Sequence, residues 1–277
     1  MSYLKSIEWV ASHYQDDLVR VIDCRFLLNN PNAGQEAYTE SHIPNAAYLH
    51  LEADLSGPVK EHGGRHPLPN LQELSERLSS LGIDQNVTIV TYDDQNGAMA
   101  SRCWWLLKYL GHENVFVMDG SFQTWQQRDL PVSSEIPQFQ SRVFKPVIQQ
   151  HLLAEFKDVK ASLDSTEITL LDSREAPRFR GEVEPIDKIA GHIPGAVNYF
   201  WLENIASDGT WKKAEEHKER FQHISKERSV IVYCGSGVTA CPNVLALHEA
   251  GFQDVKLYLG SWSDWISYED SPVEKNK

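Results

Sequence analysis

The sequence predicts an α/β protein of two similar domains in tandem, each a mainly parallel sheet flanked by helices. Two observations lead to this prediction. Short β-branched runs without polar alternation follow one another along the chain with helical segments between them, as in parallel sheets covered by helices. In addition, four segments of the first half return in the same order in the second half. An ordered internal repeat of this kind indicates a tandem duplication.

The repeat is visible as pairs of similar segments. They are LVRVIDCR and ITLLDSR, SHIPNA and GHIPGA, VTIVTYD and SVIVYC, and VFVMDGSFQTW and VKLYLGSWSDW. The two halves meet in a stretch rich in proline, serine and glutamine, which has no helical periodicity. We therefore predict a first domain at residues 1–131, a linker at 132–148 and a second domain at 149–277.

Five further segments have the apolar spacing of helices. They are Leu71–Leu81 and Ser101–Leu110 in the first domain, and Leu152–Leu163, Glu215–Ile224 and Pro242–Glu249 in the second. An Asp-x-Arg sequence follows the first repeated strand of both halves, as Asp23 and Arg25 and as Asp172 and Arg174. Because it recurs in both halves, we interpret it as a structural ion pair.

Composition limits the classes of function. The chain has 277 residues, 41% of them hydrophobic, and a formal net charge of -13, which is typical of a soluble globular protein and disfavours nucleic acid or an anionic membrane as a partner. We find neither a signal peptide nor a run of about 18 apolar residues, so we expect a cytoplasmic protein. Its four cysteines are expected to be thiols, and no cluster has zinc-ligand spacing, so we expect no metal and no cofactor.

Cys234 is the strongest candidate for a reactive group. It follows the strand SVIVY and opens the loop CGSGVTA, which leads into the next helix. Open α/β sheets bind ligands at this edge, and loop amides near a helix N-terminus favour an anion. We therefore expect a thiol more acidic than free cysteine, whose pKa is about 8.5. Gly235 and Gly237 let the backbone approach the sulfur. The first half has Asp93 or Asp94 at this place, so only the second domain is expected to be catalytic.

These motifs together resemble those of the two-domain rhodanese family of sulfurtransferases. The likeness includes the repeated D-x-R, the paired H-I-P-[GN]-A segments, YDDQNGAMASRCWW in the first half and CGSGVTA in the second, and it extends over nearly the whole chain. The resemblance implies two tandem rhodanese-like domains and an enzyme that carries a sulfane sulfur as a persulfide on Cys234. The cysteine would take sulfur from a small anionic donor and pass it to a thiophilic acceptor, cyanide or a thiol.

Within that family, a CG[ST]GVT loop is typical of enzymes similar to 3-mercaptopyruvate sulfurtransferase, whereas thiosulfate enzymes commonly have basic residues after the cysteine. The resemblance therefore favours mercaptopyruvate as donor. It assigns an acid–base relay to Ser236 with Asp54 and His66, which match the Asp and His that such enzymes take from the first domain. It also assigns the substrate-binding loop to Gly235, Gly237, Val238 and Thr239.

A carboxylate donor also needs a cation, for which a bidentate arginine is best suited. Arg178 matches the first substrate-binding arginine of the family. The second is missing, because Glu184-Pro185 is followed by Ile186. Lys188 can supply a point charge instead. This departure leaves thiosulfate open as the main donor.

Three other classes of function are weighed against this hypothesis. A Cys-x5-Arg phosphatase needs an arginine at position 240, where this chain has alanine, and a thiol–disulfide exchanger needs a C-x-x-C sequence, which is missing. A non-enzymatic rhodanese-like sulfur carrier or binding module is disfavoured by the joint presence of Cys234, Ser236, His66 and Arg178. Oligomeric state, the physiological acceptor and a resolving role for Cys241 are left open.

Overall fold

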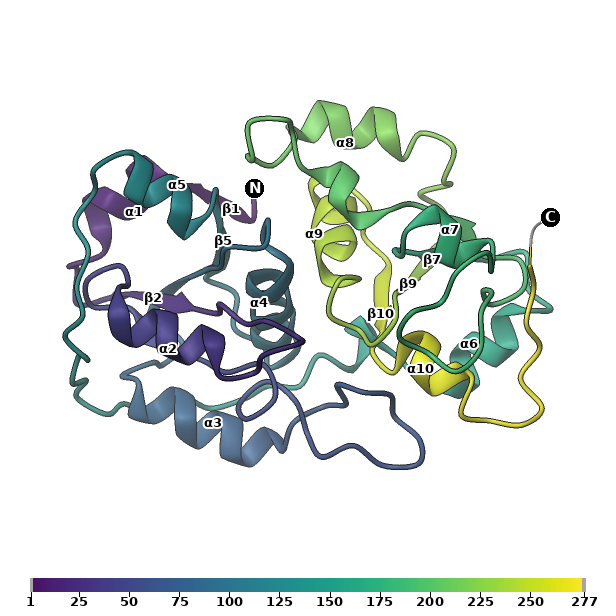
Figure 1. Ribbon diagram of the computed structural model, residues 1–277, viewed down its shortest axis with the longest axis horizontal. Coiled ribbons are helices and arrows are strands. Elements are labelled where there is room, and N and C mark those ends of the chain that lie inside the picture. Colours follow the sequence, from purple (N-terminus) through teal and green to yellow (C-terminus); the bar gives the residue numbers. More distant parts are fainter. Residues whose placement is uncertain (1, 276–277) are drawn as a thin grey trace. The chain divides into compact units, whose positions relative to one another are not determined.

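The computed structural model describes residues 2–275, which group into two compact units. Each unit is built on one five-stranded sheet, and all strand pairs of both sheets are parallel (Figure 1). The predicted fold class is thereby confirmed. Unit 1 contains Met1–Gly57, Pro69–Gln149 and Ser207–Trp211, and unit 2 contains Pro58–Leu68, Gln150–Ala206 and Lys212–Lys277. Each unit thus includes one short segment from the other half of the chain.

The sheet of unit 1 has the strand order β1-β5-β4-β2-β3. Its strands are β1 (Leu4–Ser6), β2 (Val19–Asp23), β3 (Ala47–Tyr48), β4 (Thr88–Tyr92) and β5 (Val115–Asp119). Its helices are α1 (Ile7–His13), α2 (Ala33–Glu40), α3 (Leu71–Ser80), α4 (Ala98–Tyr109) and α5 (Phe122–Gln127).

The sheet of unit 2 repeats this order as β6-β10-β9-β7-β8. Its strands are β6 (Leu153–Ala154), β7 (Ile168–Asp172), β8 (Val197–Asn198), β9 (Ser229–Tyr233) and β10 (Val255–Tyr258). Its helices are α6 (Phe156–Ser162), α7 (Ala176–Phe179), α8 (Ala214–Arg220), α9 (Cys241–Glu249) and α10 (Ser261–Trp265), with 3-10 turns η1 (Gln150–Leu152) and η2 (Trp201–Asn204). Strand β9, rich in β-branched residues, occupies the centre.

The Asp-x-Arg sequences form structural ion pairs, as predicted. Arg25 Nη2 lies 2.6 Å from Asp23 Oδ2, and Arg174 Nη2 lies 2.6 Å from Asp172 Oδ2. Both aspartates are fully buried at the end of a strand beside the central strand of their sheet. In unit 1 the carboxylate also accepts a hydrogen bond from Tyr92 Oη at 2.6 Å. These buried charges are paired and hydrogen-bonded, which is what makes their burial tolerable.

Some helix boundaries differ from the predicted ones because tertiary pairing overrides local periodicity. The helix predicted from residue 152 begins at Phe156, since Leu153 pairs with Leu257 as part of edge strand β6. At the start of the helix, Asp158 Oδ2 accepts a hydrogen bond from Glu155 N at 2.8 Å. The helix predicted over 101–110 begins three residues earlier, and the one predicted over 215–224 ends at Arg220. Among the described residues, no helix is both long and apolar enough to cross a membrane.

Candidate active site

Cys234 lies directly after the central strand β9 of unit 2. Its N–H donates to Ser261 Oγ at 3.1 Å, and its carbonyl accepts from Trp262 N at 3.0 Å. The backbone of Cys234 is therefore fixed by hydrogen bonds to the first two residues of α10. Gly237 N donates to Cys234 Sγ at 3.2 Å, so the loop turns an amide toward the sulfur, as expected. The residue is only 1% exposed. The thiol is thus fixed in a mostly desolvated loop at the carboxyl edge of the sheet.

Two glycines of the loop are required for different reasons. Gly237 has a φ of +77°, and a Cβ there would lie 2.1 Å from the carbonyl oxygen of Leu259. Gly235 has an ordinary φ, but a Cβ would lie 3.0 Å from Arg65 Nη2. The first glycine shapes the turn around the sulfur, and the second makes room for a guanidinium. The other predicted loop residues follow directly, with Val238 buried and Thr239 partly buried.

Ser236 and His66 are brought together in unit 2. Ser236 Oγ lies 2.8 Å from His66 Nδ1, and both residues are buried. His66 belongs to segment 58–68, which packs in unit 2 although it comes from the first half of the sequence. Gly63 N donates to Asp264 Oδ1 at 2.6 Å and Arg65 N to Ser263 Oγ at 3.2 Å, which fastens this segment to α10.

Asp54, the third member of the predicted relay, lies in unit 1. Its carboxylate accepts a hydrogen bond from His50 N at 2.7 Å and lies 3.6 Å from Arg77 Nε. These contacts fix the turn after β3. A contribution of Asp54 to the relay stays a prediction.

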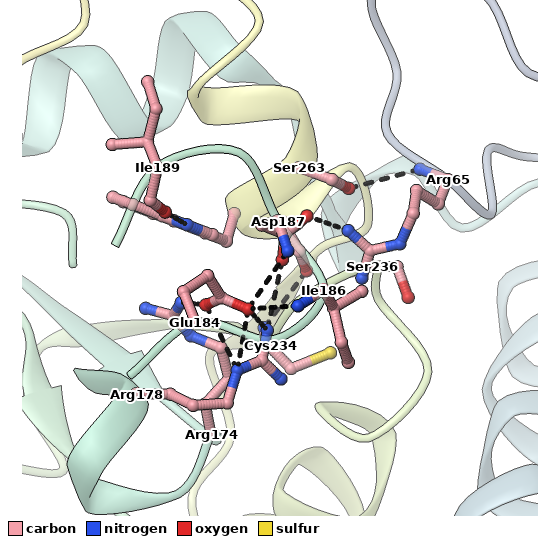
Figure 2. Close-up of polar contacts among 12 residues, drawn as sticks. Arg65, Arg174, Arg178, Glu184, Ile186, Asp187, Ile189, Cys234, Ser236 and Ser263 are labelled. Carbon is pink, nitrogen blue, oxygen red and sulfur yellow. Dashed lines mark hydrogen bonds and ion pairs between the residues drawn. The ribbon is translucent and has the colours of Figure 1, made fainter. Parts of the chain in front are cut away.

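A cluster of charged side chains lies beside the cysteine loop (Figure 2). Arg178, from α7, donates to both oxygens of Glu184 at 2.7–3.1 Å, and its Nη2 lies 3.1 Å from Asp187 Oδ2. Arg174 Nη1 contacts Glu184 at 3.3 Å, and Arg65 Nη1 forms an ion pair with Asp187 Oδ1. All three arginines are therefore paired with carboxylates from the same unit.

The two carboxylates of this cluster differ in their protonation equilibria. Burial acts against ionisation of Glu184, but hydrogen bonds from Arg178 and from backbone amides outweigh it and lower its pKa. At Asp187 burial dominates and raises the pKa, against the attraction of Arg65 and with repulsion from Glu184. Lys188, predicted as a binding cation, is exposed and lines a pocket of about 310 Å³ together with Arg65 and Asp187.

Arg65 was missed by sequence reasoning. It precedes His66, but nothing in the local pattern connects residue 65 with a loop about position 235. The signal that could have found it is indirect. The second arginine expected at position 186 is absent, and a carboxylate site needs a replacement from elsewhere.

The repeat supplies an internal comparison for the cysteine loop. In unit 1 the equivalent residue is Asp93, whose Oδ1 accepts from Gln95 N and Gly97 N at 2.7 and 2.9 Å. Its Oδ2 accepts from Met99 N and Ala100 N at 2.8 and 2.9 Å. The loop of unit 1 is therefore an anion-binding nest that is filled by its own carboxylate.

Gly97 and Gly237 correspond in the repeat and have nearly the same φ, +79° and +77°. The amides of Met99 and Ala100, which bind the second oxygen of Asp93 in unit 1, correspond to the amides of Thr239 and Ala240 in unit 2. Within residues 2–275 these two N–H groups have no hydrogen-bond acceptor. Unit 2 thus keeps donors of the nest but has a thiol in place of the carboxylate. Within the same described range, no group of three or more His, Cys, Asp or Glu side chains is arranged to hold a metal ion.

Fold and site together define a tandem α/β protein whose second unit has a cysteine in the loop after its central strand. The profile of the Rhodanese-like domain matches residues 6–128 and 155–268. A "Probable 3-mercaptopyruvate sulfurtransferase" of Pseudomonas aeruginosa is 42% identical over 275 residues, which cover 98% of this chain and 97% of that protein. A "Putative thiosulfate sulfurtransferase SseB" of Mycobacterium tuberculosis is 38% identical, with 93% and 91% covered.

Among solved structures, the crystal structure of SseA from Escherichia coli, described as one of the "3-mercaptopyruvate sulfotransferases", matches with a TM-score of 0.83 and 31% identity. The match covers 95% of this chain and 100% of that one. The chain therefore belongs to the rhodanese family, and it is a sulfurtransferase of the two-domain type.

Proposed function

We propose that this protein transfers a sulfane sulfur from 3-mercaptopyruvate, or a similar small anionic donor, to a thiophilic acceptor through a persulfide on Cys234. One observation carries the proposal. The loop that holds Asp93 in unit 1 with four amides recurs in unit 2 around Cys234, where the amides of Thr239 and Ala240 have no acceptor among the described residues. A terminal persulfide sulfur is an anion, and such amides stabilise it.

The chemistry divides into two displacements. In the first, the Cys234 thiolate attacks the donor sulfur, the carbon–sulfur bond breaks, and its electron pair stays on the carbon as the enolate of pyruvate. In the second, the acceptor attacks the outer sulfur of the persulfide, the sulfur–sulfur bond breaks, and the thiolate returns. The first step forms the sulfur–sulfur bond and oxidises Cys234 to the persulfide level, while the carbon that loses sulfur is reduced by two electrons. The second step returns Cys234 to the thiolate and leaves the sulfane sulfur on the acceptor, so the full cycle needs no external oxidant.

The pair Ser236 and His66 is placed to handle the proton of the first step. Their 2.8 Å hydrogen bond is buried, so a proton can pass between imidazole and hydroxyl without exchange with bulk water. A hydroxyl two residues after the nucleophile can then deliver it to the carbon of the enolate. Thiosulfate leaves as sulfite, which needs no such proton.

Thiosulfate is the second candidate donor. Ile186 stands where the family has a second arginine, and a compact dianion needs fewer directed contacts than a carboxylate. Arg178, oriented by Glu184, suits either donor. No disulfide joins any of the four cysteines, all of which lie within the described residues, and we place the reaction in the cytoplasm, where thiols stay reduced.

Intact mass spectrometry after incubation with each donor tests the proposal. We expect a gain of one sulfur atom that cyanide removes and that Cys234→Ser abolishes. Cys241→Ser is the matched control, because the serine hydroxyl can keep the hydrogen bond to the Gly237 carbonyl, and it should still load. No adduct with either donor would contradict the proposal. A stable adduct that no acceptor discharges would instead identify a sulfur carrier.

A further inference from the structure

The ion cluster beside the cysteine loop contains a carboxylate held between two arginines. Asp187 Oδ1 pairs with Arg65 Nη1, and its Oδ2 lies 3.1 Å from Arg178 Nη2 (Figure 2). The same groups converge on the residue next to the nucleophile. A Cβ at Gly235 would lie 3.0 Å from Arg65 Nη2, 3.6 Å from Arg178 Nη2 and 3.7 Å from Asp187 Oδ2. One carboxylate thus bridges two guanidinium groups within contact of the cysteine loop.

The two arginines are held in different ways. Arg178 donates three hydrogen bonds to Glu184, which also accepts from the backbone N–H of Asp187. Its orientation therefore does not depend on the Asp187 side chain. Arg65 is anchored by its own backbone N–H to Ser263 Oγ, while its guanidinium, a third exposed, reaches Asp187. If the Asp187 carboxylate moved away, Glu184 would still orient Arg178, and the Arg65 guanidinium would be released to pair with another anion.

Resting on the proposed function, we propose that Asp187 occupies the anion position between Arg65 and Arg178 until the carboxylate of the donor displaces it. Arg65 then supplies the cation that the chain lacks at position 186. A donor carboxylate would accept from both arginines in the geometry that Asp187 now shows, with its sulfur directed to Cys234. Asp187 thereby competes with the donor for the two arginines and lowers the affinity of the site for anions.

Charge balance explains why the carboxylate of the donor and that of Asp187 cannot both bind between the arginines. Glu184 and Asp187 offset the charges of Arg178 and Arg65, so a further anion at the same place would be in excess. There is also space into which the displaced Asp187 side chain can move. It lines the pocket of about 310 Å³ that Lys60 and Lys188 also line, and their ammonium groups can donate hydrogen bonds to the displaced carboxylate. Burial raises the pKa of Asp187, which agrees with a carboxylate that is not strongly stabilised where it lies.

Binding of pyruvate tests the proposal without requiring sulfur transfer. Pyruvate has the donor's carboxylate but no sulfur, and its affinity is read from protection of Cys234 against iodoacetamide at constant ionic strength. We expect Asp187→Asn to lower the half-protecting concentration at least threefold, and Arg65→Gln to raise it about tenfold, the effect of losing one charged hydrogen bond. A gain in affinity cannot come from a damaged fold, so Asp187→Asn stays informative if Arg65→Gln is unstable.

Two matched variants serve as controls. Glu182→Gln removes a carboxylate from the same loop, but one that pairs with exposed Arg180, and should leave pyruvate protection unchanged. Lys188→Gln tests the cation predicted from sequence. Unchanged protection in Asp187→Asn, or a tenfold loss in Lys188→Gln with none in Arg65→Gln, would overturn the proposal. The proposed function is tested separately. If it were wrong, the wild-type chain would form no persulfide, whatever the affinities of the variants for pyruvate.

Discussion

At the scale of residues, Asp93 and Cys234 show that the same kind of loop holds a carboxylate in unit 1 and a thiol in unit 2. Both follow the central strand of a sheet, and both lie in a loop shaped by a glycine with φ near +78°. The carboxylate satisfies the loop amides permanently, and burial raises its pKa against their hydrogen bonds. In unit 2 the thiol accepts from Gly237 N, and within the described residues the amides of Thr239 and Ala240 have no acceptor. The same kind of loop is therefore filled by a carboxylate in unit 1 and leaves two donors open in unit 2.

The relay can be tested by donor selectivity. Ser236→Ala removes the hydroxyl hydrogen-bonded to His66, so the enolate of pyruvate loses its proton source, whereas sulfite leaves without one. We expect kcat/KM for mercaptopyruvate to fall about 100-fold, within the range for general acid catalysis, and that for thiosulfate to fall much less. Steady-state kinetics with both donors on one preparation measure this. Equal losses would reject the relay, and Asp54→Asn in the same assay shows whether the aspartate takes part.

At the scale of elements, α10 organises the site although it contributes no reacting atom. Ser261 Oγ accepts from Cys234 N, and Trp262 N and Ser263 N donate to the carbonyls of Cys234 and Gly235. The same helix holds segment 58–68 through Asp264 and Ser263. The Cys234 loop and segment 58–68 are therefore both hydrogen-bonded to one short helix, so a shift of either one is transmitted through α10.

Gly64 tests this coupling, because a Cβ there would lie 2.3 Å from the carbonyl oxygen of Gly260 at the start of α10. We expect Gly64→Ala to displace the segment from α10 and to lower kcat/KM for mercaptopyruvate at least tenfold, by loss of aligned groups. Gly195→Ala is the matched control, since its φ of +77° is equally unfavourable but nothing lies within 4 Å of the new Cβ. It should lose about 1 kcal/mol of stability and keep its activity. Equal activities of the two variants would contradict the role given to α10.

At the scale of the whole molecule, the two units have the same strand order and separate apolar cores. Their buried polar groups differ. His217 of α8 is fully buried in unit 2, and burial, with repulsion from Arg220 and Lys212, lowers its pKa to about 4. This histidine is therefore neutral in the folded protein under conditions in which an unfolded histidine is charged.

The low pKa of His217 predicts a loss of stability in mild acid. An unfolded histidine binds a proton below a pKa of about 6.5, whereas the folded one does so only near 4. Stability is thus complete above pH 6.5 and declines as the pH falls toward 4, by up to about 3 kcal/mol. Urea unfolding at pH 7 and pH 5 measures the decline, which His217→Phe should reduce. His223→Phe, at an exposed position, should behave as wild type. An unchanged pH dependence in His217→Phe would refute the assignment.

The sequence by itself determined the tandem repeat, the parallel sheets and the place of Cys234, because each depends on residues close together in the chain. A β-branched strand, a glycine loop and a helix start within a few positions are readable locally. It also paired Ser236 with His66, through a likeness to known motifs. Only the tertiary structure decided that segment 58–68 packs in unit 2 and that Arg65 meets Asp187, 122 positions away. Contacts of that kind leave no periodicity, since they arise where separate elements pack and bring opposite charges together away from water.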